Sequence, residues 1–259
     1  MSGDDTWLPA IADPSTCILI ASKDGAATIG ATIDRCRLQA DVYVVSDGSG
    51  DDTVEVARRH GAEVLGLDEN VGKPNAIRVA YDHFSIAERY DTLLILADDT
   101  RLADDFVASA TAKFDQGVAV VCGETGSDWM HEVRWNGLVG ARALAYWRYG
   151  LFVKQGQHVL NAITVIPGSN SIFRTEVMTE LLRREVRYIV DDTQWLLDIQ
   201  TEGMGRVVYE RTPAPTSRIR PRCGRGIGRR SVGSTGRCRA FAGIGSVDDS
   251  AGSRWRTSP

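Results

Sequence analysis

The chain has 259 residues, of which 43% are hydrophobic and 25% charged. This composition is typical of a soluble globular protein, and the length suits one large α/β domain or two small ones. The net charge of -4 gives no reason to expect nucleic-acid binding, and no run reaches the roughly 18 apolar residues of a membrane-spanning helix. Residues 1–10 lack the apolar core of a signal peptide, so we expect a cytoplasmic protein.

The first half of the chain alternates between short apolar runs and amphipathic segments. The expected strands are residues 17–21, 42–45, 62–67, 93–96 and 118–122. The expected helices are residues 25–37, a segment capped by Asp51 or Asp52 and ended by Gly61, and residues 75–87 and 104–114. Strand–helix alternation at this spacing predicts an α/β fold with a mainly parallel central sheet flanked by helices.

The second half is less regular. Residues 129–158 are permissive for a helix, 163–166 are expected to form a short strand, 176–184 and 194–201 helices, and 206–209 a last strand. Five cysteines without a CxxC spacing indicate reduced thiols. We expect an N-terminal extension (1–14), one catalytic domain (15–212) and a tail (213–259). The tail is rich in Arg, Gly and Ser and too poor in large apolar residues to fold.

Polar residues follow several of the expected strands. Lys23-Asp24, Ser46-Asp47-Gly48-Ser49 and Asp98-Asp99 each come directly after one. Right-handed crossovers place such loops on one edge of a parallel sheet, where ligands bind. Adjacent carboxylates repel each other unless a cation or a proton lies between them, and Mg²⁺ or Mn²⁺ holding substrate phosphates is the natural partner. The alternative is an acidic turn that caps the helix beginning near Leu102.

Six motifs stand in one order along the chain. Ile18–Asp24 corresponds to an "AYNE" loop, Val45–Ser49 to the motif "VDDGS" and Asn70–Lys73 to "NxGK". Further along, Leu96–Thr100 corresponds to "DxDT", Pro167–Arg174 to "PGxxxxFR" and Val190–Thr193 to "xEDT". From about Cys17 to Glu210 the chain resembles the family 2 glycosyltransferases, which have the GT-A fold. The nearest branch is that of the cellulose, chitin and hyaluronan synthases.

The resemblance implies an inverting, metal-dependent glycosyltransferase of polysaccharide biosynthesis. Such an enzyme moves a sugar from a nucleotide-sugar, expected to be a UDP-sugar, to a saccharide or lipid-linked acceptor hydroxyl. The resemblance also implies a role for each site residue. Donor binding falls to Asp24, Asp47, Lys73 and Asp98, and binding of Mg²⁺ or Mn²⁺ to Asp99. The general base is Asp192, and the acceptor side consists of Gly168, Ser169, Asn170 and Asp191.

Other interpretations of single residues remain open. Asp47 has the pattern of an Asx-turn residue, Lys73 that of a solvated lysine at a helix start, and Asp191 or Asp192 that of a helix N-cap. Two positions also depart from the family, because Ser46 and Ala97 stand where an aspartate is expected. Asp98 could take over the role lost at position 97.

The tail is the larger departure. No QxxRW motif follows Ser217, and the change to Arg, Gly and Ser resembles a GC-rich gene read in a shifted frame. The alternative is a genuine basic tail that contacts anionic lipid headgroups, giving peripheral membrane association. Two further functions are therefore kept open. One is transfer to a polyprenyl-phosphate acceptor, and the other is a catalytically inactive remnant that still binds a nucleotide-sugar.

Overall fold

The computed structural model describes residues 15–114, 117–124, 126–127, 141, 144–145, 147–184, 191–210 and 216–217. The chain divides into two compact units at residues 220 and 221, and the second unit lies wholly outside the described residues. The predicted N-terminal extension and the tail beyond Ser217 are likewise outside them, so their predictions stay untested.

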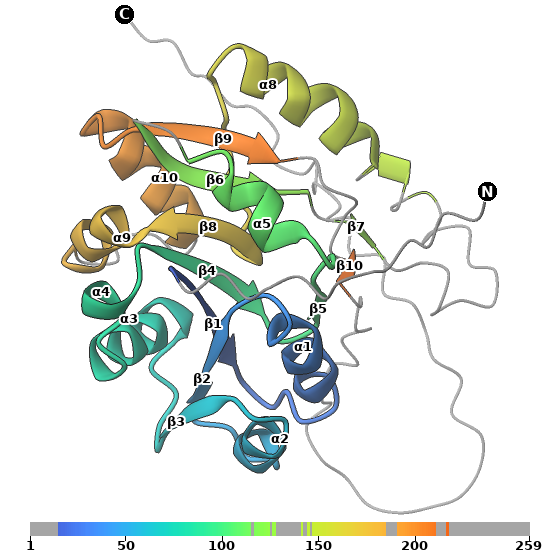
Figure 1. Cartoon of the computed structure of the whole chain (residues 1–259), viewed down its shortest axis with the longest axis vertical. Helices are drawn as coiled ribbons and strands as arrows, with labels where there is room; N and C mark the ends of the chain where they lie inside the picture. The colour runs from blue at the N-terminus through green and yellow to red at the C-terminus, as the bar shows by residue number, and fades with distance from the viewer. Residues whose placement is uncertain are drawn as a thin grey trace, which may run out of the picture. The chain divides into compact units, whose positions relative to one another are not determined.

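A seven-stranded sheet forms the centre of the described part, in the order β3–β2–β1–β4–β8–β6–β9 (Figure 1). The strands are β1 Thr16–Ser22, β2 Asp41–Asp47, β3 Glu63–Leu67, β4 Thr92–Ala97, β6 Val118–Gly123, β8 Asn170–Arg174 and β9 Arg206–Glu210. Neighbouring strands run parallel except at β8, which pairs antiparallel with both β4 and β6. The prediction of a mainly parallel α/β sheet is confirmed.

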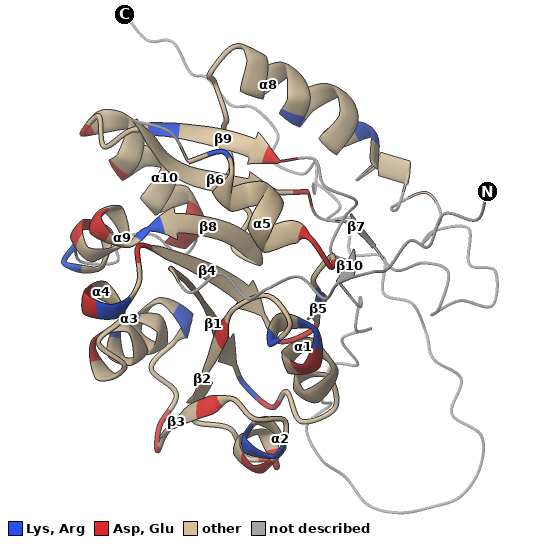
Figure 2. Ribbon diagram, viewed as in Figure 1, with Lys and Arg blue, Asp and Glu red and all other residues tan. Residues whose placement is uncertain are grey.

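The two central strands β1 and β4 contain no charged residue, as Figure 2 shows for β4, and they are apolar except for Thr16, Ser22 and Thr92 at their ends. They pair in register, with Ile18 opposite Leu94 and Ile20 opposite Leu96. Successive side chains point to opposite faces, so the interior of a strand covered by helices on both sides is apolar on both. Burying each of these isoleucines and leucines contributes about 1.5–3 kcal/mol.

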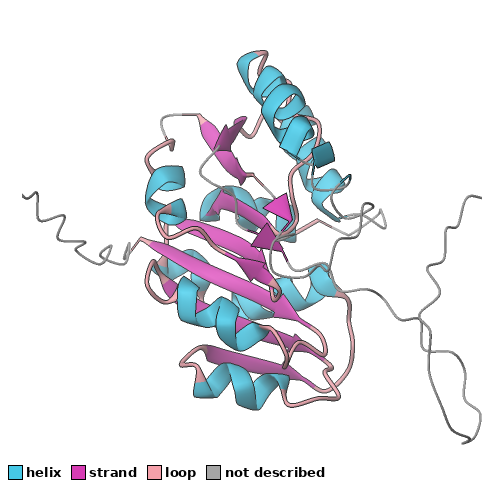
Figure 3. Ribbon diagram, turned by 90° about the vertical axis from the view of Figure 1, so that its right-hand side faces the viewer, coloured by secondary structure: helices cyan, strands magenta, loops and turns pink. Residues whose placement is uncertain are grey.

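Helices cover both faces of the sheet (Figure 3). They are α1 Ile29–Cys36, α2 Thr53–Arg59, α3 Lys73–His83, α4 Ile86–Arg89, α5 Phe106–Thr111, α8 Gln155–Val159, α9 Thr175–Leu182 and α10 Asp191–Thr201. Helices α1, α2 and α5 pack with Ile18 and Ile20 in one core, while α3, α4, α9 and α10 pack with Leu19 in the other. Alternation along β1 thus assigns these seven helices to their faces, whereas α8 has no buried residue.

Three parts of the second half differ from expectation. Residues 163–166 form no strand, and Ile163 and Ile166 are apolar because they are buried in the core beside α10. The end of the long helix-permissive stretch contains a π-helix, η1 Tyr149–Lys154, directly before α8, while residues 128–140 lie outside the described ones. Three two-residue strands, β5 Thr100–Arg101, β7 Gly126–Ser127 and β10 Thr216–Ser217, form a small second sheet.

The described helices include none that is both long enough and apolar enough to cross a membrane. Cys17, Cys36 and Cys122 are buried free thiols, as their positions in apolar segments predicted. Burial raises the pKa of all three, so these cysteines stay protonated at neutral pH.

The half-buried histidine His158 in α8 gives the fold a testable pH dependence. The Nδ1 atom of His158 accepts a hydrogen bond from the backbone N–H of Tyr209 at 3.3 Å. Burial lowers the pKa of His158, and the charges of Lys113 and Arg206 lower it further. The neutral imidazole is therefore favoured in the folded chain, and its contribution is complete above the pKa of an unfolded histidine, about 6.5.

We expect the free energy of unfolding to fall as the pH drops below that value toward the lower pKa of the folded state. Urea denaturation at pH 7.5 and pH 5.5 measures this, with His158→Asn as the control because its amide oxygen can accept the same bond without titrating. An equal pH dependence in the variant and the wild type would assign the effect to other groups.

Candidate active site

The carboxyl ends of β1, β2 and β4 lie side by side at one edge of the sheet. Ser22 pairs with Ser46, and Ala21 pairs with Ala97, so the three strands end at the same level. The loops that follow them carry the predicted donor-binding carboxylates. The predicted convergence of these loops on one rim is therefore what the structure shows.

The loop after β1 is held by the loop after β2. Asp24 has a positive φ of 54°, donates its backbone N–H to Ser49 Oγ at 3.1 Å, and accepts the N–H of Gly50 on Oδ1 at 2.8 Å. In the loop after β2, hydrogen bonds from the Thr53 hydroxyl and from backbone amides hold the pKa of Asp51 below its usual value, although burial alone would raise it. Asp24 thus lies exposed, and its side chain and backbone join the loop after β1 to the loop after β2.

Asp47 is buried at the end of β2, where it organises the loop after β3. Its Oδ1 accepts the backbone N–H of Val71 at 2.7 Å, and its Oδ2 accepts that of Gly72 at 3.0 Å. Carboxylate bonds to backbone amides are about twice as strong as neutral ones. Asp47 therefore fixes the loop that leads to Lys73, which the Asx-turn interpretation did not anticipate.

Asp98 is half-buried and its side chain faces the start of the β1–α1 loop. The hydroxyl of Ser22 donates to Asp98 Oδ2 at 2.6 Å, and the hydroxyl of Thr32 donates to the Asp98 backbone carbonyl at 2.9 Å. A Cβ atom added to Gly25 would lie only 2.1 Å from both Asp98 Oδ2 and Ser22 Oγ. The observed contacts of Asp98 thus join the ends of β1 and β4.

This crowding predicts a strong effect of Gly25→Ala. The added methyl group overlaps Asp98 and Ser22, so we expect the free energy of unfolding to fall by about 1–3 kcal/mol, as overpacking does elsewhere. Urea denaturation measures the change. Gly156→Ala is the control, because a Cβ there has open space in α8 and should stabilise the chain by up to about 1 kcal/mol. Equal stabilities of the two variants would contradict the packing.

Asp99 is half-buried in the turn between β4 and β5, immediately beyond Asp98. Across from it, the Ala97 backbone N–H donates to the carbonyl of Ser169 at 3.3 Å, which places the β4 end against the loop before β8. Within the described residues, no group of three His, Cys, Asp or Glu side chains is arranged to hold a metal ion.

The loop before β8 joins the donor side of the rim to helix α10. Lys73 Nζ donates to the backbone carbonyl of Gly168 at 2.5 Å. A Cβ atom on Gly168 would lie 3.1 Å from Asp192 Oδ2 and 3.5 Å from Lys73 Nζ. Residues from the first and last thirds of the chain thus meet around Gly168, and an added Cβ there would be in tight contact with the Asp192 carboxylate.

Asp191 and Asp192 form the first turn of α10 and are both half-buried. Because α10 begins at Asp191, both are helical residues, and Asp192 is not the N-cap. The Oδ2 atom of Asp191 is buried and has no hydrogen-bond partner among the described residues. The positive end of the helix dipole stabilises negative charge on both carboxylates.

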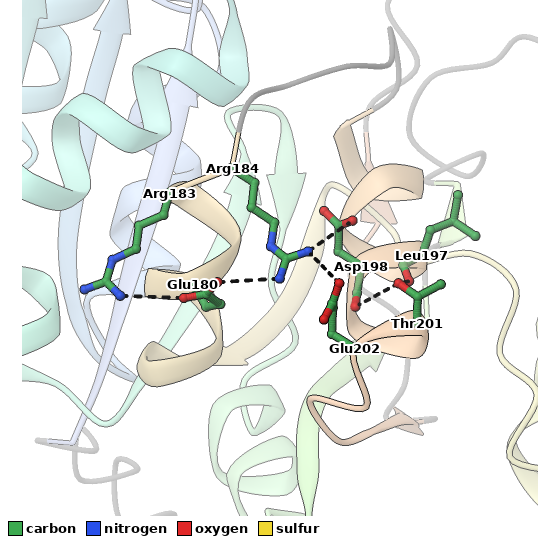
Figure 4. Close-up of polar contacts among 7 residues, drawn as sticks. All are labelled: Glu180, Arg183, Arg184, Leu197, Asp198, Thr201 and Glu202. Atoms are coloured by element: carbon green, nitrogen blue, oxygen red, sulfur yellow. Dashed lines mark hydrogen bonds and ion pairs between the residues drawn. The ribbon is translucent and has the colours of Figure 1, made fainter.

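The other end of α10 is fixed by ion pairs to α9 (Figure 4). Arg184, just beyond α9, contacts Glu180 at 3.5 Å, Asp198 at 3.7 Å and Glu202 at 3.3 Å. Arg184 therefore connects both helices through one guanidinium group. This arrangement orients the helix that carries Asp192.

Ser169 and Asn170 contribute to the site through the backbone and through packing. Asn170 is fully buried, and its Nδ2 donates to the backbone carbonyl of Glu124 at 2.9 Å. Its contacts place it as a support for the end of β6. Of the predicted acceptor-side loop, Gly168 is therefore the residue that the structure brings against Asp192.

Two residues of this region escaped the sequence analysis. Ser22, which holds Asp98, follows an apolar strand and could have been found from its place at a strand end. Lys154, which is 5% exposed and donates to the carbonyl of Val165, gives no such signal. It lies in a π-helix, and neither its burial nor that helix follows from a hydrophobic pattern.

Comparison with known proteins identifies the family. The sequence model of "Glycosyl transferase family 2" matches residues 17–182, while no curated protein sequence gives a significant match. Glucosyl-3-phosphoglycerate synthase from Mycobacterium tuberculosis has a similar structure. In its complex with Mn²⁺, UDP and glucosyl-3-phosphoglycerate, the TM-score is 0.56 at 16% identity, covering 80% of this chain and 73% of that chain.

Two further complexes of that enzyme agree. The one with Mn²⁺, UDP-glucose and phosphoglyceric acid has a TM-score of 0.56 at 17% identity over 80% of this chain and 73% of that chain. The one with Mg²⁺ and UDP has a TM-score of 0.53 at 17% identity over 80% and 72%. At these identities the likeness establishes the GT-A fold. The family match covers more than half of the sequence, and the chain therefore belongs to glycosyl transferase family 2.

Proposed function

We propose that the chain is an inverting glycosyltransferase that uses a UDP-sugar and a divalent metal ion. The observation that carries this proposal is the meeting of Lys73 and Asp192 at Gly168, next to the rim that holds Asp98 and Asp99. A donor diphosphate at the rim and an acceptor hydroxyl near Asp192 would then lie on opposite sides of the anomeric carbon. That placement is what a single displacement with inversion requires.

Residues of three loops bind the donor in this proposal, each contacting a different part of it. Asp24, on the exposed side of the rim, is the carboxylate that accepts the uracil imide N–H, and Asp47 shapes the nucleoside pocket by fixing Val71 and Gly72. Lys73 places a positive charge near the diphosphate while its Nζ is oriented by the Gly168 carbonyl. Asp98 holds the first loop in place through Ser22.

The residues present fit a divalent ion. Mg²⁺ and Mn²⁺ are commonly held by one or two carboxylates together with substrate phosphates, and Asp99 supplies a half-buried carboxylate at the strand end. A bound ion would neutralise the charge that develops on the leaving diphosphate. The similar synthase structures contain Mn²⁺ or Mg²⁺ together with UDP, which supports the same choice here.

The chemical step assigned to this chain's own residues is proton removal. Asp192 takes the proton from the acceptor hydroxyl as that oxygen bonds to the anomeric carbon and the bond to the diphosphate breaks. Asp191 and the loop of Gly168, Ser169 and Asn170 lie beside it on the acceptor side. We assign a saccharide or lipid-linked acceptor, as in the polysaccharide synthase branch. The similar synthase structure contains glucosyl-3-phosphoglycerate, which points instead to a small phosphorylated acid, and acceptor assays decide between the two classes.

Calorimetric titration of the 259-residue chain with UDP tests the donor site. We expect saturable binding in the presence of Mn²⁺, at least tenfold weaker binding with EDTA, and weaker binding of ADP under the same conditions. UDP binding without later turnover of any UDP-sugar would favour the inactive remnant. The absence of UDP binding would contradict the proposed function in both forms.

A further inference from the structure

The segment between α8 and β8 is anchored in the core, although residues 163–169 belong to no helix or strand. Ile163 and Ile166 are almost fully buried within it. Backbone carbonyls that lack a helix or sheet partner need hydrogen bonds from elsewhere when they are taken out of water. This segment, the 163–169 loop, brings Gly168 against Asp192, so its conformation bears on the site.

Five elements of the fold each donate one hydrogen bond to a backbone carbonyl of this loop. The bonds run from Gln200 to Ile163 at 2.9 Å, from Lys154 to Val165, from Ser171 to Pro167 at 2.7 Å, from Lys73 to Gly168 at 2.5 Å and from the backbone N–H of Ala97 to Ser169 at 3.3 Å. The donors come from α10, η1, β8, α3 and β4. The position of the loop is therefore set by contacts from other parts of the chain.

Lys154 is the unusual member of this group of donors. It is 5% exposed, and among the residues that the structure describes it is the only buried lysine or arginine. Burying a lysine amino group costs free energy, whereas an apolar side chain of similar size would fill the same space without that cost. A lysine at this position is therefore explained better by what its Nζ contacts than by packing.

The helix that carries Lys154 turns this side chain inward and its apolar side chains outward. Lys154 is the last residue of the π-helix η1, in which Phe152 is 65% exposed and Val153 is 40% exposed. An amphipathic helix on the surface of a globular protein normally has the opposite arrangement. Helices of the π type are rare and are frequent at functional sites. The inward direction of Lys154 thus does not follow from hydrophobic burial of its helix.

Lys154 lies within electrostatic reach of Asp192. Burial lowers the pKa of Lys154, and its interactions with Cys122 and with the Asp192 carboxylate oppose that shift. Val165, whose carbonyl Lys154 holds, stands only three residues before Gly168. A Cβ atom on Gly168 would lie 3.1 Å from Asp192 Oδ2. Lys154 is therefore placed to control how this loop meets the proposed base.

We propose that Lys154 is a positioning residue of the transfer reaction. Its bond to the Val165 carbonyl fixes the 163–169 loop from the buried side, so that Gly168 stays against Asp192 while the acceptor hydroxyl loses its proton. The inference rests on the proposed function, because it takes Asp192 as the base. Lys154 acts on the acceptor half of the site and not on UDP, which binds at the rim formed by the loops after β1, β2 and β4.

Lys154→Met tests this role, because the thioether side chain has a similar length and volume but cannot donate to the Val165 carbonyl. We expect UDP release from a UDP-sugar in the presence of Mn²⁺ to slow by about tenfold or more, since small displacements near reacting atoms have effects of this size. The Kd for UDP should remain that of the wild type. Backbone amide hydrogen exchange across residues 163–169 should become about tenfold faster, as expected for the loss of a strong hydrogen bond.

Two further variants distinguish positioning from a general contribution to stability. Lys154→Arg keeps a charged donor and should recover part of the lost rate. Gln200→Met removes a neutral donor from the start of the same loop, so it should speed exchange near residue 163 and leave UDP release close to the wild-type rate. Urea denaturation shows which variants are folded, and Lys154→Gln replaces Lys154→Met should the latter not fold.

The outcomes separate this role from the proposed function. An unchanged rate or unchanged hydrogen exchange in Lys154→Met would overturn the positioning role while UDP binding persists. An equal loss of rate in Gln200→Met would overturn it as well, because any loosening of the loop would then have the same effect. The absence of UDP binding or of turnover in the wild type would instead contradict the proposed function.

Discussion

Asp192→Asn is expected to lower the rate of sugar transfer by about 10²–10⁴-fold while leaving UDP affinity unchanged. The amide cannot accept the proton of the acceptor hydroxyl, but it has nearly the same size and keeps the contact at Gly168. The first turn of α10 should therefore remain in place. UDP release in the presence of a saturating acceptor measures the rate, and calorimetry measures the affinity.

Two other carboxylates of α10, Asp198 and Asp191, serve as comparisons for the Asp192 variant. Asp198→Asn changes a carboxylate on the same helix that contacts Arg184 far from Gly168, and the transfer rate should stay near the wild-type value. Asp191→Asn tests the adjacent carboxylate, whose Oδ2 is buried. A larger loss of rate in Asp191→Asn than in Asp192→Asn would move the base to position 191.

Asp99→Asn is expected to weaken metal-dependent UDP binding by about 10²-fold or more. Asp99 is the carboxylate assigned to the ion, and an amide oxygen is a much poorer ligand for a hard cation than a carboxylate. Loss of the ion removes charge stabilisation of several kcal/mol from the diphosphate. Titration of UDP with and without Mn²⁺ gives the ratio directly, and Mn²⁺ electron paramagnetic resonance reports the bound ion.

Asp98 and Asp104 provide the comparison for this variant. Asp104→Asn changes an exposed carboxylate whose partner is Arg35 and should not alter UDP binding. Asp98→Ala removes the acceptor of the Ser22 hydroxyl, so its main effect should be a lower free energy of unfolding. If Asp98→Ala abolished the dependence on Mn²⁺ and Asp99→Asn did not, the metal ligand would be Asp98.

The sequence pattern was sufficient for the centre of the fold. Unbroken apolar runs predicted β1 and β4, because the interior of a strand covered on both faces is apolar, with the polar residues Thr16, Ser22 and Thr92 only at the strand ends. The loops that follow such strands lie at one edge, so the sequence alone predicted that Asp24, Asp47 and Asp98 lie on the same rim. The ordered motifs then indicated the family, and the family match confirmed it.

The remainder depended on contacts between distant residues. The antiparallel direction of β8 is set by its pairing with Leu96 and Val121, which no local pattern encodes. Ile163 and Ile166 are buried without strand pairing, so an apolar run alone could not distinguish the two cases. The roles of Ser22 and Lys154 likewise arise from partners far along the chain.

The most direct test of the central claim is metal-dependent release of UDP from UDP-sugars by the whole chain. A panel of UDP-glucose, UDP-galactose and UDP-N-acetylglucosamine is incubated with Mn²⁺ or Mg²⁺, with EDTA, and with the Asp192→Asn variant. The assignment of donor, metal and base predicts release from at least one donor, its loss with EDTA, and its loss in the variant. Release that persists in EDTA, or that Asp192→Asn does not reduce, would contradict it.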